Sequence, residues 1–133
     1  MQNSKSKMQS CNSKSKIDIK KRAFAYALEI IKFIDQLNKN DLSVQVIARQ
    51  LLRSGTSIGA NIIEAQSSSS RKEFTNFLNY SLKSANESKF WLALLRDSGK
   101  AKKESVDNLL SETKELANIL ASSILTLKGK RKS

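Results

Sequence analysis

Apolar residues recur along the chain at the spacing of an α-helix, in four blocks that short polar stretches separate. The blocks span residues 17–37, 42–66, 71–98 and 103–127. In the second block the apolar and small positions alternate in steps of four and three residues, which places them on one helix face. These positions are Val44, Ala48, Leu51, Gly55, Ile58, Ile62 and Ala65. Four such helices predict an all-α protein, folded as an antiparallel up-down-up-down four-helix bundle.

The first block has a wider apolar face than packing inside a single bundle requires. One stripe consists of Ala23, Ala27, Ile30, Ile34 and Leu37. A second stripe of Phe24, Leu28 and Ile31 lies beside it. In the third block Phe90 and Trp91 are neighbours, so their side chains point to different faces. Because large apolar side chains outside a core are typical of interaction surfaces, we expect a second buried surface between subunits.

Two glycines, Gly55 and Gly59, lie inside the second predicted helix, where each costs roughly 1 kcal/mol relative to alanine. The third predicted helix has small residues on the face expected to lie opposite: Ser81, Ser84, Ala85 and Ser88. We therefore expect the second and third helices to approach closely, with hydroxyl groups hydrogen-bonding across the contact. A phosphate-binding loop is disfavoured, because the segment lacks the lysine and the preceding strand of a P-loop.

Polar residues of the second and third helices also share helix faces. Ser57, Asn61 and Glu64 follow at i, i+4 and i+7, and Ser84 and Glu87 are three residues apart. We expect them to form a polar network inside the bundle that sets the register of the helices. A carboxylate metal site is the alternative, but such sites in bundles use Glu-x-x-His pairs and this chain has no histidine.

The composition gives no basis for catalysis. The chain has no histidine and only one cysteine, Cys11, so it offers no disulfide, zinc site or His-based acid–base pair. We expect a protein that is not an enzyme and that uses no metal or other cofactor. No segment has the apolar core of a signal peptide or the length of a membrane span, so the expected location is the cytoplasm.

Positive charge is concentrated at the two ends of the chain, whose formal net charge is +12. Residues 1–22 contain seven Lys or Arg against one Asp, residues 128–133 contain four, and the stretch between is nearly neutral. We expect a disordered basic tail at 1–16, a bundle at 17–127 and a basic C-terminal tail at 128–133.

Lysine and arginine attract polyanions through counterion release, so the expected partner is nucleic acid, RNA rather than DNA. The predicted contacts are Lys5, Lys7, Lys14, Lys16, Lys20, Lys21, Arg22, Lys128, Lys130, Arg131 and Lys132. A purely solubilising role of the tails is an alternative. Attraction to anionic lipid is another, although the tails lack an apolar anchor.

The run 50–65 (QLLRSGTSIGANIIEA) and the run 70–78 (SRKEFTNFL) resemble the bacterial four-helix bundle protein family. Its founding members are encoded by intervening sequences in 23S ribosomal RNA genes. The positions that match the family motif are Arg53, Ser57, Ile58, Asn61, Glu64, Glu73, Phe74, Leu78, Ser84 and Glu87. The chain departs from the motif at Ala65 and Lys83, where glycine is usual. The resemblance covers about residues 20–127.

The resemblance implies a homo-oligomer, namely a pentameric ring of bundles. The chain is similar as well to the accessory variability determinant of diversity-generating retroelements, a pentameric basic bundle that binds a reverse transcriptase and its template RNA. Two functions follow as expectations. One is a non-enzymatic, oligomeric RNA-binding protein linked to a ribosomal RNA intervening sequence, and the other is an oligomeric scaffold for a protein partner such as a reverse transcriptase.

Overall fold

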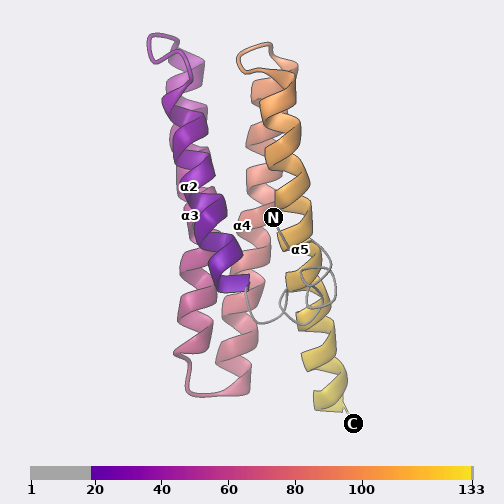
Figure 1. Cartoon of the computed structure of the whole chain (residues 1–133). Helices are drawn as coiled ribbons and strands as arrows, with labels where there is room; N and C mark the ends of the chain where they lie inside the picture. Colours follow the sequence, from indigo (N-terminus) through magenta and orange to yellow (C-terminus); the bar gives the residue numbers. More distant parts are fainter. Residues whose placement is uncertain (1–18, 133) are drawn as a thin grey trace, which may run out of the picture.

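The structure, a computed structural model, describes the backbone of residues 19–132 and the side chains of residues 19–129. It consists of four helices: α2 (Ile19–Asp35), α3 (Leu42–Gln66), α4 (Arg71–Asp97) and α5 (Lys103–Lys132) (Figure 1). No strand occurs between residues 19 and 132, and the predicted all-α class is confirmed. The fourth helix is longer than predicted, because α5 continues past Leu127 to Lys132.

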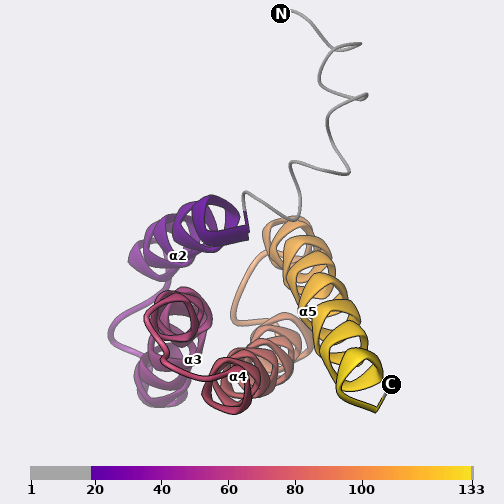
Figure 2. The same ribbon diagram turned by 90° about the horizontal axis from the view of Figure 1, so that it is seen from below.

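The three connections lie at alternate ends of the bundle, and the four helices surround a common core (Figures 1 and 2). Each helix packs against the next along the chain, and α2 also contacts α5. The largest side chains that are fully buried in this core include Tyr26, Ile30, Leu51, Ile58, Ile62, Leu92, Leu95, Leu116 and Leu120. They recur at helical spacing, so burial of one face of each helix accounts for the packing, although Tyr26 belongs to neither stripe predicted for the first helix.

Side-chain caps and one glycine mark the helix boundaries. Asp41 caps α3 by accepting a hydrogen bond from the Val44 amide at 3.2 Å. Ser70 caps α4 in the same way, through the Glu73 amide at 3.1 Å. After α4, Gly99 has a φ of 75°, a left-handed conformation that glycine adopts without a steric penalty.

The two glycines of α3 lie against α2, so the prediction that they face the third helix is wrong, although α3 and α4 do pack closely. A Cβ atom on Gly55 would lie 3.2 Å from the Ile30 side chain, and one on Gly59 would lie 3.4 Å from the Ala23 Cβ atom. The glycines therefore allow the backbone of α3 to come close to small and branched side chains of α2. Both occupy the flank of the α3 stripe that turns toward α2.

Hydroxyl groups do hydrogen-bond between α3 and α4, as predicted. Ser54 and Ser88 share a buried hydrogen bond of 2.8 Å, and Ser81 donates to the Ile58 carbonyl at 2.8 Å. Next to this pair, the Tyr26 hydroxyl of α2 lies 2.7 Å from the Thr113 hydroxyl of α5. The core therefore contains hydroxyl pairs contributed by all four helices.

The buried position of Tyr26 determines its protonation state. It raises the pKa of Tyr26 to about 12, because the loss of solvation outweighs the hydroxyls of Thr113 and Ser88, which lower the pKa. Tyr26 is therefore a neutral hydrogen-bonding group at physiological pH and has no general-base role.

Candidate nucleic-acid interface

Exposed cations from three separate parts of the sequence lie in one half of the bundle. The start of α4 and the last turns of α5 lie at the lower end in Figure 1, and the first turn of α2 lies higher, nearer the middle. We call the exposed cations of this region the basic end: Lys20, Lys21, Arg71, Lys72 and Lys128. The topology of the bundle, rather than adjacency in sequence, brings them together.

The cations of the basic end have no acidic partners within the described part of the chain. None of the five forms an ion pair with any residue in the range 19–129. In sequence, Asp18 lies close to Lys20 and Lys21 but outside the described residues. Near Arg71 and Lys72 the acidic residues are Glu64, which is exposed, and Glu73, whose carboxylate accepts a hydrogen bond from the Ser69 amide at 2.8 Å. An uncompensated group of cations is a surface that attracts phosphate groups.

The structure places the predicted contact residues unequally. Lys20, Lys21 and Lys128 are exposed members of the basic end. Arg22 instead forms a two-point ion pair with Glu112, with Nη2–Oε1 and Nε–Oε2 distances of 2.8 and 3.1 Å. That pair joins α2 to α5.

Other predicted contacts cannot be placed at the level of side chains. Lys5, Lys7, Lys14 and Lys16 lie outside the described residues. Lys130, Arg131 and Lys132 belong to the final turn of α5, and only their backbone is described. Their segment is thus helical rather than a tail separate from the bundle.

Arg71 and Lys72 are two members of the basic end that the sequence analysis missed. They lie in the nearly neutral middle of the chain, so a count of charge along the sequence does not single them out. The sequence does contain one signal that could have identified them, namely their position directly after the turn between α3 and α4. In an up-down bundle, that turn lies at the same end as the start of the first helix and the end of the last.

The predicted polar network does not lie inside the bundle. Arg53 and Glu87 form a surface ion pair of 2.8 Å, and the Trp91 indole donates to the same Glu87 carboxylate at 2.9 Å. Ser57 and Asn61 hydrogen-bond to backbone carbonyls of their own helix. The prediction is wrong because Ser54 and Ser88 occupy the buried contact between α3 and α4.

Three other motif residues have limited roles in the described structure. Glu64 is exposed, Glu73 belongs to the cap of α4, and Ser84 accepts a hydrogen bond from Ser88 through its backbone carbonyl. In the part of the chain that the structure describes, no group of three His, Cys, Asp or Glu residues could hold a metal ion. None of the described helices is long and apolar enough to cross a membrane.

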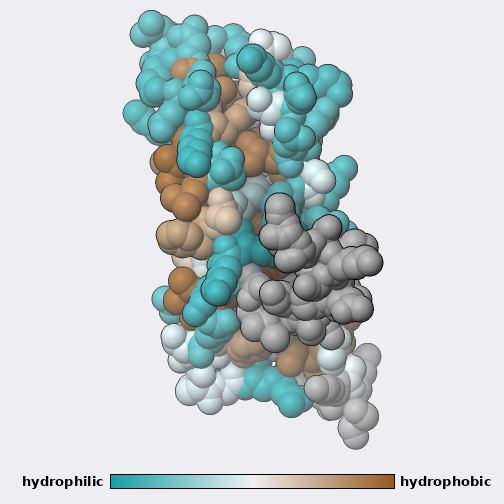
Figure 3. All heavy atoms as spheres, in the orientation of Figure 1, coloured by the Kyte–Doolittle hydropathy of each residue, from teal (hydrophilic) through white to brown (hydrophobic). Residues whose placement is uncertain are grey.

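Two apolar surfaces also remain exposed on the bundle. The α2–α3 apolar surface consists of Phe24, Leu28, Ile31, Leu52 and Ile63. Figure 3 shows hydrophobic surface along the side of the molecule where α2 and α3 lie. The α4 apolar surface consists of Phe90 and Leu94, with the Phe90 ring edge-on to Trp91 at a centroid distance of 4.9 Å.

The sequence model of a family described as 23S rRNA-intervening sequence protein matches residues 15–122. The chain belongs to this family. No curated protein matches it in sequence. Among solved structures it is similar to a protein of unknown function from the S23 ribosomal protein family of Bacteroides thetaiotaomicron, with 38% identity and a TM-score of 0.75. That match covers 80% of this chain and 97% of the other.

Membership in the 23S rRNA-intervening sequence protein family confirms the resemblance found on residues 50–65 and 70–78. The structural similarity supports the four-helix bundle as the fold of the matched region. No enzymatic activity is ascribed to the family or to the similar protein from Bacteroides thetaiotaomicron.

Proposed function

We propose that this family member is a non-enzymatic, oligomeric RNA-binding protein of the bacterial cytoplasm, which contacts RNA through the basic end. The observation that carries the proposal is the group of exposed cations from α2, α4 and α5 without ion-pair partners among the described residues. The adjoining sequence adds further cations at Lys14, Lys16 and 130–132. Contacts of this kind bind the phosphate backbone with little base specificity.

The oligomer is the second part of the proposal. The α2–α3 and α4 apolar surfaces lie on different helices, and Phe24 and Phe90 are 66% and 57% exposed. If one surface of a subunit packs on the other surface of its neighbour, the contact is heterologous, and heterologous contacts that close form rings. We propose a ring of five subunits, each an antiparallel bundle, because that is the number the family resemblance implies. A ring would present several basic ends to one RNA, so weak contacts would become multivalent.

RNA binding is tested by fluorescence anisotropy of a labelled 23S ribosomal RNA hairpin titrated with the full chain at several salt concentrations. We expect the logarithm of the association constant to fall linearly with the logarithm of salt concentration. Replacement of Arg71 and Lys72 by glutamine should reduce the magnitude of this slope by about 0.7 to 0.9 per lost phosphate contact.

The matched control neutralises two cations at the other end of the bundle, Lys39 and Lys102. This variant should retain the original slope. Equal effects of the two variants would contradict a localised RNA surface, and absence of binding at low salt would overturn the RNA proposal.

Self-association is tested separately by sedimentation velocity. Phe24→Ser and Phe90→Ser should each dissociate the oligomer, because each removes a large aromatic side chain from a proposed contact. Leu125→Ser is the control, since Leu125 is 70% exposed on α5 and belongs to neither apolar surface. A monomeric unmodified chain at micromolar concentration would contradict the oligomer.

An oligomeric protein scaffold, for example an accessory subunit for a reverse transcriptase, is the second candidate function. It is supported by a groove between α2 and α5 that neither the basic end nor the two apolar surfaces include. This function becomes the preferred one if RNA fails to bind.

A further inference from the structure

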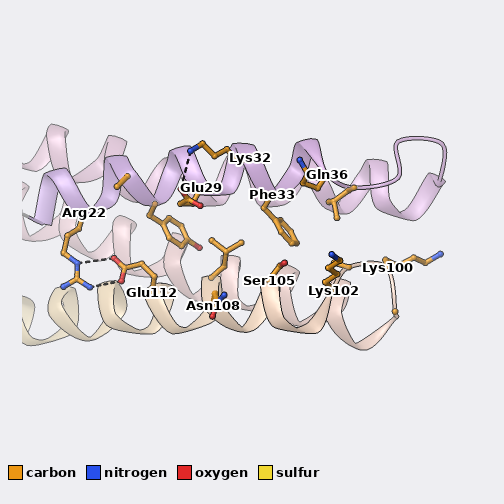
Figure 4. A pocket seen from close by; sticks show the side chains of 16 residues that line it. Arg22, Glu29, Lys32, Phe33, Gln36, Lys100, Lys102, Ser105, Asn108 and Glu112 are labelled. Atoms are coloured by element: carbon orange, nitrogen blue, oxygen red, sulfur yellow. Dashed lines mark hydrogen bonds and ion pairs between the residues drawn. The ribbon is translucent and has the colours of Figure 1, made fainter. Parts of the chain in front are cut away.

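A groove of about 1020 Å³ runs between α2 and α5 (Figure 4). Its apolar lining includes Phe33, Leu37 and Leu109, whose side chains are otherwise mostly buried. The Arg22–Glu112 ion pair crosses one end of the groove, and the turn at residues 99–102 bounds the other. The lining between Arg22 and Leu37 is helical over most of its length, so at 1.5 Å per residue the groove is roughly 22 Å long.

The groove exists because α2 packs closely on α3 and less closely on α5. On the α3 side, Gly55 and Gly59 let Ile30 and Ala23 approach the backbone. On the α5 side, the lining positions Ser105 and Asn108 are short and polar, and they do not fill the space opposite Phe33. The result is an apolar floor between two helices with a polar rim.

We infer that this groove binds an amphipathic helix of a partner protein, with apolar residues facing Phe33 and Leu109 and acidic residues facing the rim. A 22 Å groove accommodates about four helical turns, the length over which i, i+3, i+4 and i+7 anchors are presented. Its volume lies at the upper limit of about 1000 Å³ for small-molecule pockets. The groove is also open along one side, where Glu29, Lys32 and Asn108 are exposed. This openness disfavours a lipid as the ligand, because a bound acyl chain would remain partly in water.

The lysines on the rim of the groove favour a partner helix with acidic residues along its flanks. Lys102 is exposed and has no ion pair with any described residue, and Lys32 is held only loosely by Glu29 at 3.7 Å. Lys100 is already neutralised by Asp41 at 2.6 Å, and Arg22 by Glu112. The two remaining lysines, one on each side of the groove, are positioned to pair with carboxylates on either side of a bound helix.

The inference does not depend on RNA binding, because it uses a different part of the surface. The probe is a display library of 16-residue helices with variable apolar residues at i, i+3, i+4 and i+7 and with Glu, Lys or Ser at the flanking positions. Selection on the full chain should enrich glutamate at the flanks. The enriched peptide should bind with micromolar affinity in fluorescence anisotropy.

Two substitutions locate the bound peptide. Ser105→Trp fills the groove and should weaken binding at least tenfold, whereas Asn118→Trp, on the exposed side of α5, should have no effect. Lys102→Glu should weaken binding about tenfold, whereas Lys114→Glu, which makes the same charge change outside the groove, should not. Circular dichroism of each variant verifies that the helices are retained.

Several outcomes would overturn the inference. These are the absence of any enriched peptide, enrichment of lysine flanks, and equal binding to the chain with Ser105→Trp. A change in oligomeric state caused by Ser105→Trp would show instead that a second copy of the chain occupies the groove. Loss of RNA affinity in the same variant would assign the groove to the RNA surface.

Discussion

The two ends of the bundle contain similar residue types and use their charges in opposite ways. At the basic end, Arg71, Lys72 and Lys128 are exposed without acidic partners among the described residues. At the opposite end, which we call the paired end, Arg96, Lys100 and Lys103 are neutralised within the fold, whereas the exposed Lys39 and Lys102 have no ion pair with a described residue. Its ion pairs are Lys100–Asp41 at 2.6 Å, Arg96–Asp97 and Arg96–Asp107 at 2.8 Å, and Lys103–Asp107 at 2.6 Å.

This difference separates cations that stabilise the fold from cations available to a partner. Hydrogen bonds from Lys100 and from the Val44 amide lower the pKa of Asp41 to about 2. Hydrogen bonds from Lys103 and Arg96 lower the pKa of Asp107, and Arg96 lowers that of Asp97. The carboxylates of the paired end are therefore held ionised by their neighbours. A total charge of +12 does not reveal this division, because it counts both kinds of cation alike.

The largest expected effect comes from making the paired end resemble the basic end. Asp41→Asn, Asp97→Asn and Asp107→Asn together remove the partners of Lys100, Arg96 and Lys103. We expect the melting temperature to fall by about 5 to 10 °C, because charge-assisted hydrogen bonds are lost, although asparagine at position 41 can still cap α3. RNA affinity at low salt should rise several-fold, since the released cations can contact phosphate.

Circular dichroism melts and RNA anisotropy measure these two changes. The control combines Asp35→Asn, Glu104→Gln and Glu115→Gln, which also removes three carboxylates, all exposed and without an ion pair to any described residue. If both sets raise RNA affinity equally, total charge rather than pairing governs binding.

The second-largest effect should come from acid, which removes the stability that ionised Asp41 contributes at the paired end. The pKa of Asp41 is lower in the folded chain than its ordinary value of 3.8, so its contribution to stability is present above about pH 4. That contribution is lost as the pH falls from 4 toward 2, because the unfolded chain binds the proton first. Asp41→Asn should therefore show a smaller decrease in melting temperature over this range than the unmodified chain, by about 2 to 4 °C. An identical pH profile would contradict the assigned role of Asp41.

Loss of the cap at the basic end should cost less than the triple change at the paired end. Ser70→Ala removes the side-chain acceptor for the Glu73 amide, and such losses cost about 1 kcal/mol. Urea denaturation measures this free energy of unfolding. Ser69→Ala serves as the control, because it removes only the 3.2 Å hydrogen bond from the Ser69 hydroxyl to Glu73 and keeps the one from the Ser69 amide. Equal effects of the two substitutions would show that the cap contributes no specific stability.

The smallest effect is the relief of repulsion at the basic end. Arg71→Gln with Lys72→Gln should raise the melting temperature by about 1 °C in low salt, because two adjacent cations no longer repel each other and no longer oppose the helix dipole in the first turn of α4. The gain should vanish near 1 M salt, where the Debye length is about 3 Å. A gain that persists at high salt would point to helix propensity as the cause.

The number, type and approximate bounds of the helices were predictable, because each apolar face repeats at the period of a helix. The sites were less predictable. The pattern assigned Gly55 and Gly59 to a contact with the third helix, whereas they face α2. It also placed Glu87 inside the bundle, whereas Glu87 accepts hydrogen bonds from Arg53 and Trp91 at the surface. A helical period gives the angular width of a face, and neighbouring positions on that face can point to different helices.

The sequence by itself determined that the chain forms four amphipathic helices and carries an excess of positive charge, since both follow from residue types and local spacing. Only the tertiary structure decided which cations are paired and which remain available to a partner. Arg71 and Lys128 lie at the same end because α4 begins where α5 ends, and Arg96 meets Asp107 because one turn returns the chain onto itself. Electrostatic pairing depends on distances of a few ångströms, which only the packing of the helices sets.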